Sequence, residues 1–227
     1  MALYQSEPKG IYIWNNGTPR LPSAYQEVEY IGNTDWQYID TGYICSNNTK
    51  VEWKMWWWVQ SWSHQMFWAR DFWGSGWKWY AIVTDAYQFD SNAWVTHWMT
   101  DGNIHTGSFW QDWLYVDWDL KAQIPTATFT CSRNLYLFCL NAGYQTEQAS
   151  MRYYYFKMYE SWVLVRNFIP CYRKSDNEPW MYDIVNGVFY TNQGSWTFTV
   201  WNDYTPIDKE IKKVYKWSTQ VRPPVSI

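Results

Sequence analysis

The sequence IVNGVFYTN, residues 184–192, contains the strongest β-hairpin signal in the chain. Its Asn186-Gly187 pair suits a tight turn because both residues adopt positive φ angles readily, and β-branched or aromatic residues flank it. Upstream, residues 151–159 (MRYYYFKMY) and 163–168 (VLVRNF) have the composition of strands. This part of the chain therefore predicts antiparallel strands, not helices.

Strand-like segments of this kind recur, separated by Gly, Asn, Asp and Ser. The others are residues 51–59, 79–83, 113–116, 127–130, 135–140, 187–191 and 197–201. Residues 135–140 (LYLFCL) are apolar throughout, which predicts one strand covered on both faces. In residues 151–159, strict alternation places Arg152 and Lys157 on opposite faces. Many short strands with turn residues between them indicate an all-β sandwich or barrel.

The length of 227 residues suits one large all-β domain. We expect residues 1–20 to form an N-terminal arm and residues 21–204 to form the domain. Residues 205–227 have five Lys or Arg against two acidic residues, with a Pro-Pro pair near the end. They are expected to be a C-terminal tail or linker.

Charge and hydropathy exclude several classes of partner. The net charge of −3 gives no global basic field, so nucleic acid is not the expected partner. No apolar run approaches the roughly 18 residues that a membrane span needs. The first ten residues have neither the charged nor the apolar region of a signal peptide.

The aromatic fraction is the outlying number. It reaches 22%, with 21 Trp and 20 Tyr. These are more rings than one core holds, so several are expected at the surface, where Trp and Tyr stack on sugars and anchor interfaces. The alternative is that most of the indoles fill the sandwich. The excess favours a binding function.

Three stretches resemble a known family: residues 21–30 (LPSAYQEVEY), 37–43 (QYIDTGY) and 167–192. They are similar to the concanavalin A-like, laminin-G-like jelly-roll domains of gut bacterial surface proteins and of phage tail or other virion proteins. The resemblance covers residues 21–201 and is weakest over 53–110. It implies an antiparallel two-sheet jelly-roll sandwich with loops at its rim. It also implies a virion or cell-surface location and an adhesion or carbohydrate-recognition role. The implied partners are a glycan or host-surface receptor, other virion or surface proteins, and further copies of the chain in a homo-oligomer.

Tryptophan stands at several places where such domains have Gly in a turn. These residues are Trp118, Trp162, Trp180, Trp196 and Trp201. A bulky residue at positive φ costs about 1–2 kcal/mol. Two explanations stay open. Either the turns have rearranged to display Trp, or the codons are UGA in an organism that reads UGA as Gly.

No carboxylate motif for glycoside hydrolysis is present, so we expect no enzyme. Asp117 and Asp119 alternate, but in a segment that reads as a hairpin turn. Glu27 and Glu29 also alternate, and a solvated strand face is their expected place. A glycoside hydrolase is the less favoured alternative.

We expect no metal site and no cofactor. The histidines His64, His97 and His105 are dispersed, and a site built from His97, Asp101 and His105 has only coincidental spacing in its favour. Calcium at the rim, held by Asp85, Asp90 and Asp101, is the alternative. The four cysteines are expected to be structural or free thiols, with Cys131 and Cys139 on facing segments as the one conceivable pair.

The candidate ligand-binding residues are Trp73, Trp77, Lys78, Trp79 and Trp98. The first four lie in or beside a Gly- and Ser-rich segment that reads as a rim loop, and Trp98 lies in a second such loop. The alternative is a strand in which Trp77 and Trp79 point inward. The sequence thus predicts a non-catalytic carbohydrate- or receptor-binding module. The alternative is a purely structural virion or surface component.

Overall fold

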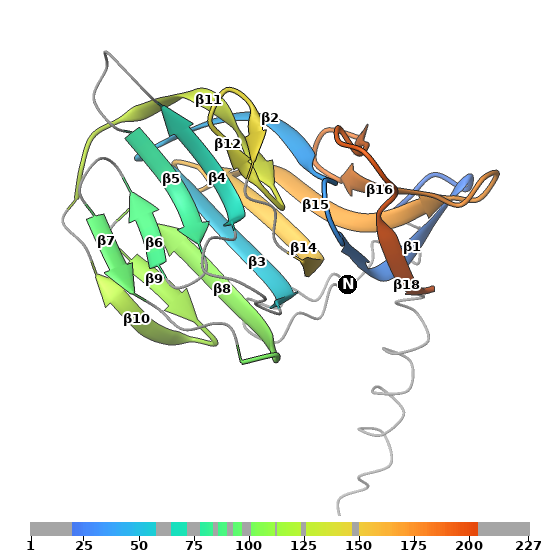
Figure 1. Ribbon diagram of the computed structural model, residues 1–227, viewed down its shortest axis with the longest axis horizontal. Coiled ribbons are helices and arrows are strands. Elements are labelled where there is room, and N and C mark those ends of the chain that lie inside the picture. The colour runs from blue at the N-terminus through green and yellow to red at the C-terminus, as the bar shows by residue number, and fades with distance from the viewer. Residues whose placement is uncertain are drawn as a thin grey trace, which may run out of the picture.

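Figure 1 shows the computed structural model, which describes residues 20–57, 65–71, 78–83, 86–89, 93–96, 101–111, 113–123, 126–146 and 150–203. These residues form eighteen strands, and none of them belongs to a helix that could cross a membrane. Apart from Arg20, the predicted N-terminal arm lies outside the described residues, as does the predicted tail.

One sheet contains ten of these strands. In sheet order they are β10 (Asp119–Gln123), β9 (Trp113–Val116), β8 (Ile104–Trp110), β3 (Thr49–Trp57), β14 (Met151–Glu160), β1 (Tyr25–Gly32), β15 (Val163–Arg173), β16 (Glu178–Asp183) and β17 (Val188–Tyr190), and β18 (Thr199–Asp203) also pairs with β1. Every pairing in this sheet is antiparallel.

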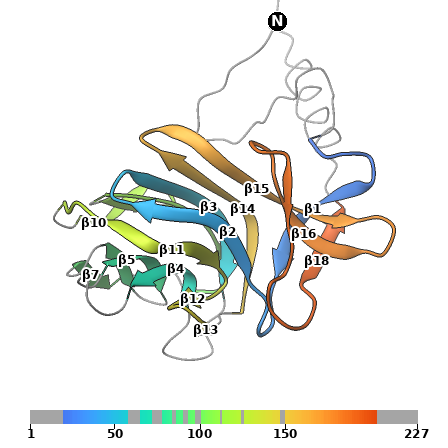
Figure 2. The same cartoon turned by 90° about the horizontal axis from the view of Figure 1, so that it is seen from above.

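The second sheet contains eight strands. They are β2 (Ile39–Ser46), β4 (Gln65–Asp71), β5 (Lys78–Val83), β6 (Ala86–Phe89), β7 (Ala93–Thr96), β11 (Thr130–Leu137), β12 (Leu140–Asn141) and β13 (Gln145–Thr146). Seen from above, β3 and β14 form one layer and β4 and β5 the other (Figure 2). The predicted all-β fold, an antiparallel two-sheet sandwich of the jelly-roll type, is confirmed, with one parallel pairing between β12 and β4.

Strand β3 shows why the two sheets pack. Its buried positions alternate strictly along the strand, so Trp53, Met55 and Trp57 face the core while the residues between them face outward. The indole of Trp53 meets Phe67 of the opposite sheet edge to face, with ring centroids 5.6 Å apart. Burying a large apolar side chain stabilises a fold by about 1.5–3 kcal/mol. Aromatic contacts of this kind therefore hold the layers together.

Residues 135–140 do not form the single strand that their composition predicts. Strand β11 ends at Leu137, and the chain turns at Phe138, whose φ is 74°, before β12 begins. The predicted burial is confirmed for five of the six side chains, and Tyr136 is half-buried. Burial explains the composition, because an apolar turn inside the sandwich needs the same residue types as a central strand.

Arg152 and Lys157 lie on the same face of β14, so their predicted separation is wrong. A β-bulge between Tyr153 and Tyr155 inserts one extra residue and reverses the alternation. Arg152 then pairs with Trp56 of β3, and Lys157 pairs with Glu52. Both cations consequently project from the outer face of the ten-stranded sheet.

A turn that contains Asn186-Gly187 is confirmed between β16 and β17, but it spans residues 184–187 and only Gly187 of the pair has a positive φ, of 69°. Trp118, Trp162 and Trp196 also have positive φ angles, as expected for glycine positions. The same expectation is wrong for two residues. Trp180 lies within β16 and Trp201 within β18, and neither has a positive φ.

Candidate functional site

A row of outward-facing side chains crosses four neighbouring strands of the ten-stranded sheet. The strand register aligns Tyr115 of β9 with Ser108 of β8, Ser108 with Glu52 of β3, and Glu52 with Lys157 of β14. Ser108 is by far the shortest of the four. The face is therefore hollowed along β8, between a tyrosine on one side and an ion pair on the other.

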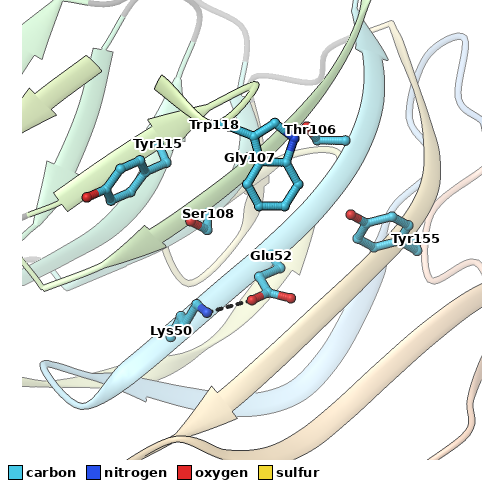
Figure 3. Close-up of a pocket in the computed structure, with 8 residues that line it drawn as sticks. All are labelled: Lys50, Glu52, Thr106, Gly107, Ser108, Tyr115, Trp118 and Tyr155. Carbon is cyan, nitrogen blue, oxygen red and sulfur yellow. Dashed lines mark hydrogen bonds and ion pairs between the residues drawn. The ribbon is translucent and has the colours of Figure 1, made fainter. Parts of the chain in front are cut away.

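This hollow, which we name the β8 trough, has a volume of about 280 Å³. Its lining residues are Lys50, Glu52, Thr106, Gly107, Ser108, Tyr115, Trp118 and Tyr155. Figure 3 shows Thr106, Gly107 and Ser108 between the two walls, with Tyr115 on one side and Glu52 on the other.

Because Gly107 has no side chain, the core residue Trp53 packs directly beneath the floor of the trough. A Cβ atom at this position would lie only 2.3 Å from Cζ2 of Trp53, so the indole occupies the space under the strand. Trp53 itself is fully buried. The floor is therefore backed by a rigid ring and cannot collapse inward.

Glu52 is the only carboxylate among the residues that line the trough, and cations and a hydroxyl hold it in place. Its Oε1 lies 2.5 Å from Nζ of Lys50, and its Oε2 lies 3.8 Å from Nζ of Lys157. The hydroxyl of Tyr159 donates a 2.9 Å hydrogen bond to Oε2. The polar wall of the trough is thus ordered before any ligand arrives.

Three indoles lie beside the trough and form what we call the aromatic ridge: Trp110, Trp113 and Trp162. The ring of Trp110 lies 4.3 Å from that of Trp162 and 6.0 Å from that of Trp113, between centroids. Trp113 and Trp162 are exposed. Lys50 connects the ridge to the trough, because its Nζ lies 5.4 Å from the ring centroid of Trp162.

A cluster of Asp101, His105 and Asp117 adjoins the trough at the start of β8. Nδ1 of His105 lies 2.6 Å from a carboxylate oxygen of Asp117, and Nε2 lies 2.8 Å from one of Asp101. Asp117 also accepts hydrogen bonds from the backbone N–H and the hydroxyl of Thr106. The cluster therefore fixes the β9–β10 turn against the floor residue of the trough.

The cluster shifts the pKa of each member. Burial alone would lower the pKa of His105, but its hydrogen bonds to Asp117 and Asp101 outweigh burial and raise it. Hydrogen bonds from Asn103 and then from His105 lower the pKa of Asp101 to about 2. Burial opposes the change at Asp117, yet hydrogen bonds from His105 and Thr106 lower its pKa as well. At neutral pH both carboxylates are ionised.

Within the described residues no group of three or more His, Cys, Asp or Glu side chains could hold a metal ion. Asp101 and His105 do lie together, as in the His97, Asp101 and His105 arrangement that the sequence suggests by coincidence, but His97 is outside the described residues. His64, Asp85 and Asp90 are outside them too. The absence of a resident calcium ion stays a prediction.

Three of the predicted ligand-binding residues, Trp73, Trp77 and Trp98, lie outside the described residues. Lys78 and Trp79 begin strand β5 of the eight-stranded sheet. Trp79 is half-buried against a small apolar cluster that includes Trp68, with the two rings 6.0 Å apart edge to face. Ligand binding by this segment stays a prediction, and the trough lies on the other sheet.

The alternating acidic residues have different environments. Glu27 is buried and forms an ion pair with Arg20, so its expected place on a solvated strand face is wrong. Arg20 explains the burial, because a paired carboxylate loses less free energy on leaving water.

Asp117 and Trp118 are the two turn residues between β9 and β10, which confirms the predicted hairpin turn.

All four cysteines, Cys45, Cys131, Cys139 and Cys171, are buried free thiols, so no disulfide links Cys131 to Cys139. Burial raises the pKa of Cys45, Cys139 and Cys171, and for Cys171 to about 12. Thiolate is the reactive form of cysteine. Nucleophilic chemistry at these positions is therefore disfavoured.

Apart from Trp118, which the sequence marks only as a turn residue, the sequence did not point to the residues of the trough. Two signals were available. Residues 49–57 alternate polar and apolar side chains, which places Lys50, Glu52 and Lys54 on one outer face. The segment Thr106-Gly107-Ser108 is the other signal, because three small residues inside a strand indicate a hollowed surface or a close approach.

Comparison of the chain with protein-family models, with curated proteins and with solved structures finds no match.

Proposed function

We propose that this protein is a non-catalytic carbohydrate-binding module of a virion appendage or bacterial surface protein, and that it binds a surface glycan in the β8 trough. The observation that supports this most strongly is the trough itself. It combines hydroxyl groups on the floor, aromatic rings on both sides and an ordered ion pair in one hollow. Small-ligand sites usually have this composition of apolar walls and a few fixed polar groups.

The chemistry of a sugar ring matches these walls. Its apolar C–H face stacks on an aromatic ring, here offered by Tyr115 and Tyr155. Its hydroxyls both donate and accept hydrogen bonds. The carboxylate of Glu52 accepts them, the ammonium of Lys50 donates them, and Ser108 does both. A ligand with only apolar or only charged groups would leave part of this surface unused.

Hydrolysis is not part of the proposal. Glycosidases use two carboxyl groups about 5–10 Å apart, one as the acid and one as the nucleophile or base. Glu52 has the only carboxyl group among the residues that line the trough, and this group forms an ion pair with Lys50. This arrangement supports binding without cleavage.

The alternative function is a structural component whose sandwich only packs against neighbouring proteins. The resemblance to laminin-G-like jelly rolls suits either function. The exposed indoles Trp36, Trp196 and Trp201 favour this second candidate, because they lie away from the trough lining and offer apolar contact area.

A glycan array screened with the purified chain tests the proposal. A variant that fills the trough, Ser108→Phe, should lose every glycan signal, because its ring occupies the floor. Trp36→Ala removes an exposed ring elsewhere and should keep the signals. Equal glycan signals for the wild type and Ser108→Phe would contradict the proposal, and no signal for the wild type would favour the structural alternative.

A further inference from the structure

We infer that the β8 trough and the aromatic ridge form one continuous site for several consecutive units of a linear polysaccharide. This rests on the proposed function and adds the class of ligand: a chain, not a single sugar. The trough alone, at about 280 Å³, matches one ring or little more. The ridge extends the same surface beyond it.

The first support is the direction of the hollow. Its floor begins at Thr106 and follows β8, and the same outer face of β8 ends at Trp110. Four residues of strand span about 14 Å. That distance is longer than one sugar ring, so the floor and the ridge together accommodate several units placed end to end.

The second support is the register at the ridge. The row next to Tyr115–Ser108–Glu52–Lys157 consists of Trp113, Trp110, Lys50 and Tyr159, aligned across the same four strands. Both rows face outward, so the ridge and the trough belong to one surface. On β8, the first row has its shortest side chain, Ser108, and the second row has the indole of Trp110. A chain leaving the trough along β8 therefore meets an aromatic ring.

The third support is Lys50, which belongs to both parts. Its ammonium group forms the ion pair with Glu52, and it lies over the rings of Tyr159 and Trp162 at 5.1 and 5.4 Å from their centroids. These contacts already hold the long side chain in one conformation, so ligand binding costs little further side-chain entropy. A fixed donor at the boundary can bind the hydroxyls of two adjacent units.

The test uses fragments of one to six sugar units, made by partial acid hydrolysis of the polysaccharide that gives the strongest array signal. Calorimetric titration of the wild type should show affinity rising at least tenfold from one unit to four and then levelling. Trp110→Ala and Trp113→Ala should abolish most of that rise while changing the affinity for one unit less than twofold. Trp36→Ala, the matched control, should behave as the wild type does.

Two results would overturn the inference. One is an affinity that does not change with fragment length. The other is a ridge variant that weakens binding of all fragments equally while its melting temperature is unchanged. Either result, combined with loss of binding in Ser108→Phe, leaves the proposed function standing. An array without any glycan signal would remove both.

Discussion

Asp117 and Trp118 are consecutive and both have positive φ angles, 50° and 73°. They form the two-residue turn between β9 and β10, and a pair of positive φ angles is the mark of a type I′ turn. Asp-Gly and Asn-Gly are the preferred sequences for such a turn, because glycine has no Cβ to clash. Ser161 and Trp162 repeat the relationship between β14 and β15, with φ angles of 47° and 73°.

Replacing the turn indoles by glycine should therefore stabilise the protein. Trp118 and Trp196 are 61% and 73% exposed, so Trp118→Gly and Trp196→Gly lose little packing and relieve about 1 kcal/mol of backbone strain each. Trp162→Gly should gain less, because it also loses the ring contact with Trp110. Urea unfolding measures the differences.

Trp180→Gly is the matched control for this experiment. Trp180 lies in a strand, half-buried, with its ring 5.2 Å from that of Phe189. Its loss should destabilise the protein by about 2 kcal/mol or more. If Trp118→Gly and Trp196→Gly destabilise the protein as much as Trp180→Gly does, positive φ does not strain the tryptophans at these turns.

The same φ angles bear on the two explanations for tryptophan at glycine positions. If the source organism reads UGA as Gly, mass spectrometry of the native protein will find glycine at 118, 162 and 196. Glycine would relieve the backbone strain at all three positions, and at 162 it would leave Trp110 and Trp113 as the indoles of the aromatic ridge. Native peptides that contain Trp at these positions would establish that the turns have changed to display an indole.

Gly107→Ala should destabilise the sandwich. Its Cβ would lie 2.3 Å from the buried ring of Trp53, which is packed on all sides and has nowhere to move. Forcing an extra methyl group into such a site typically costs about 1–3 kcal/mol. Thermal unfolding checks this, with Gly42→Ala as the control, because a Cβ at Gly42 meets no atom within 4 Å. Gly42 has a φ of 62°, so its own cost is one of backbone strain alone. Equal melting temperatures for wild type and Gly107→Ala would contradict the packing described for the trough floor.

The cluster around His105 should make stability depend on pH. The folded state raises the pKa of His105 above its ordinary 6.5, so the contribution of the imidazolium is complete below that pH and disappears as pH rises through the raised value. The folded state lowers the pKa of Asp101 and Asp117 below 3.8, so their contribution exists above that pH and disappears in stronger acid. The cluster therefore stabilises most between these limits.

His105→Gln is the variant that tests this dependence. Melting temperatures from pH 4 to pH 9 should fall at the alkaline end for the wild type, and the fall should be smaller for the variant. The fall should also be smaller in Asp117→Asn, which removes one of the two carboxylates that face the ring. Identical profiles for all three proteins would contradict the role assigned to the cluster.

The sequence predicts the sandwich well because its strands obey local rules. Alternation in β3 and the Asn186-Gly187 turn each depend on a few neighbouring residues. Features that depend on long-range pairing are missed. Pro170 illustrates this: a residue without an N–H donor is expected to end a strand, yet β15 continues through it. Pro170 pairs with Met181 of β16 on one edge, and on the other edge it lies between the stretches of β15 that pair with β14 and with β1. No partner there requires the missing N–H group.

The trough was missed for the same reason. Lys157 lies near Glu52 because a bulge between Tyr153 and Tyr155 moves its side chain to the outer face of the sheet. No local sequence pattern predicts that bulge. The neighbours Tyr115 and Ser108 are seven residues apart and meet through strand register. Residues 71–79 attract attention in the sequence instead, because three Trp lie within seven residues there.

Binding of a glycan in the β8 trough is the central claim, and Tyr115→Ala tests it most directly. Tyr115 forms one wall of the trough, on the outer face and outside the core, so its loss should not alter the fold. A stacked ring at an anchor position is worth at least about 1 kcal/mol, which corresponds to roughly fivefold in affinity. Calorimetric titration with the strongest array glycan should show binding at least fivefold weaker in Tyr115→Ala, at an unchanged melting temperature. Unchanged affinity in Tyr115→Ala would contradict the claim.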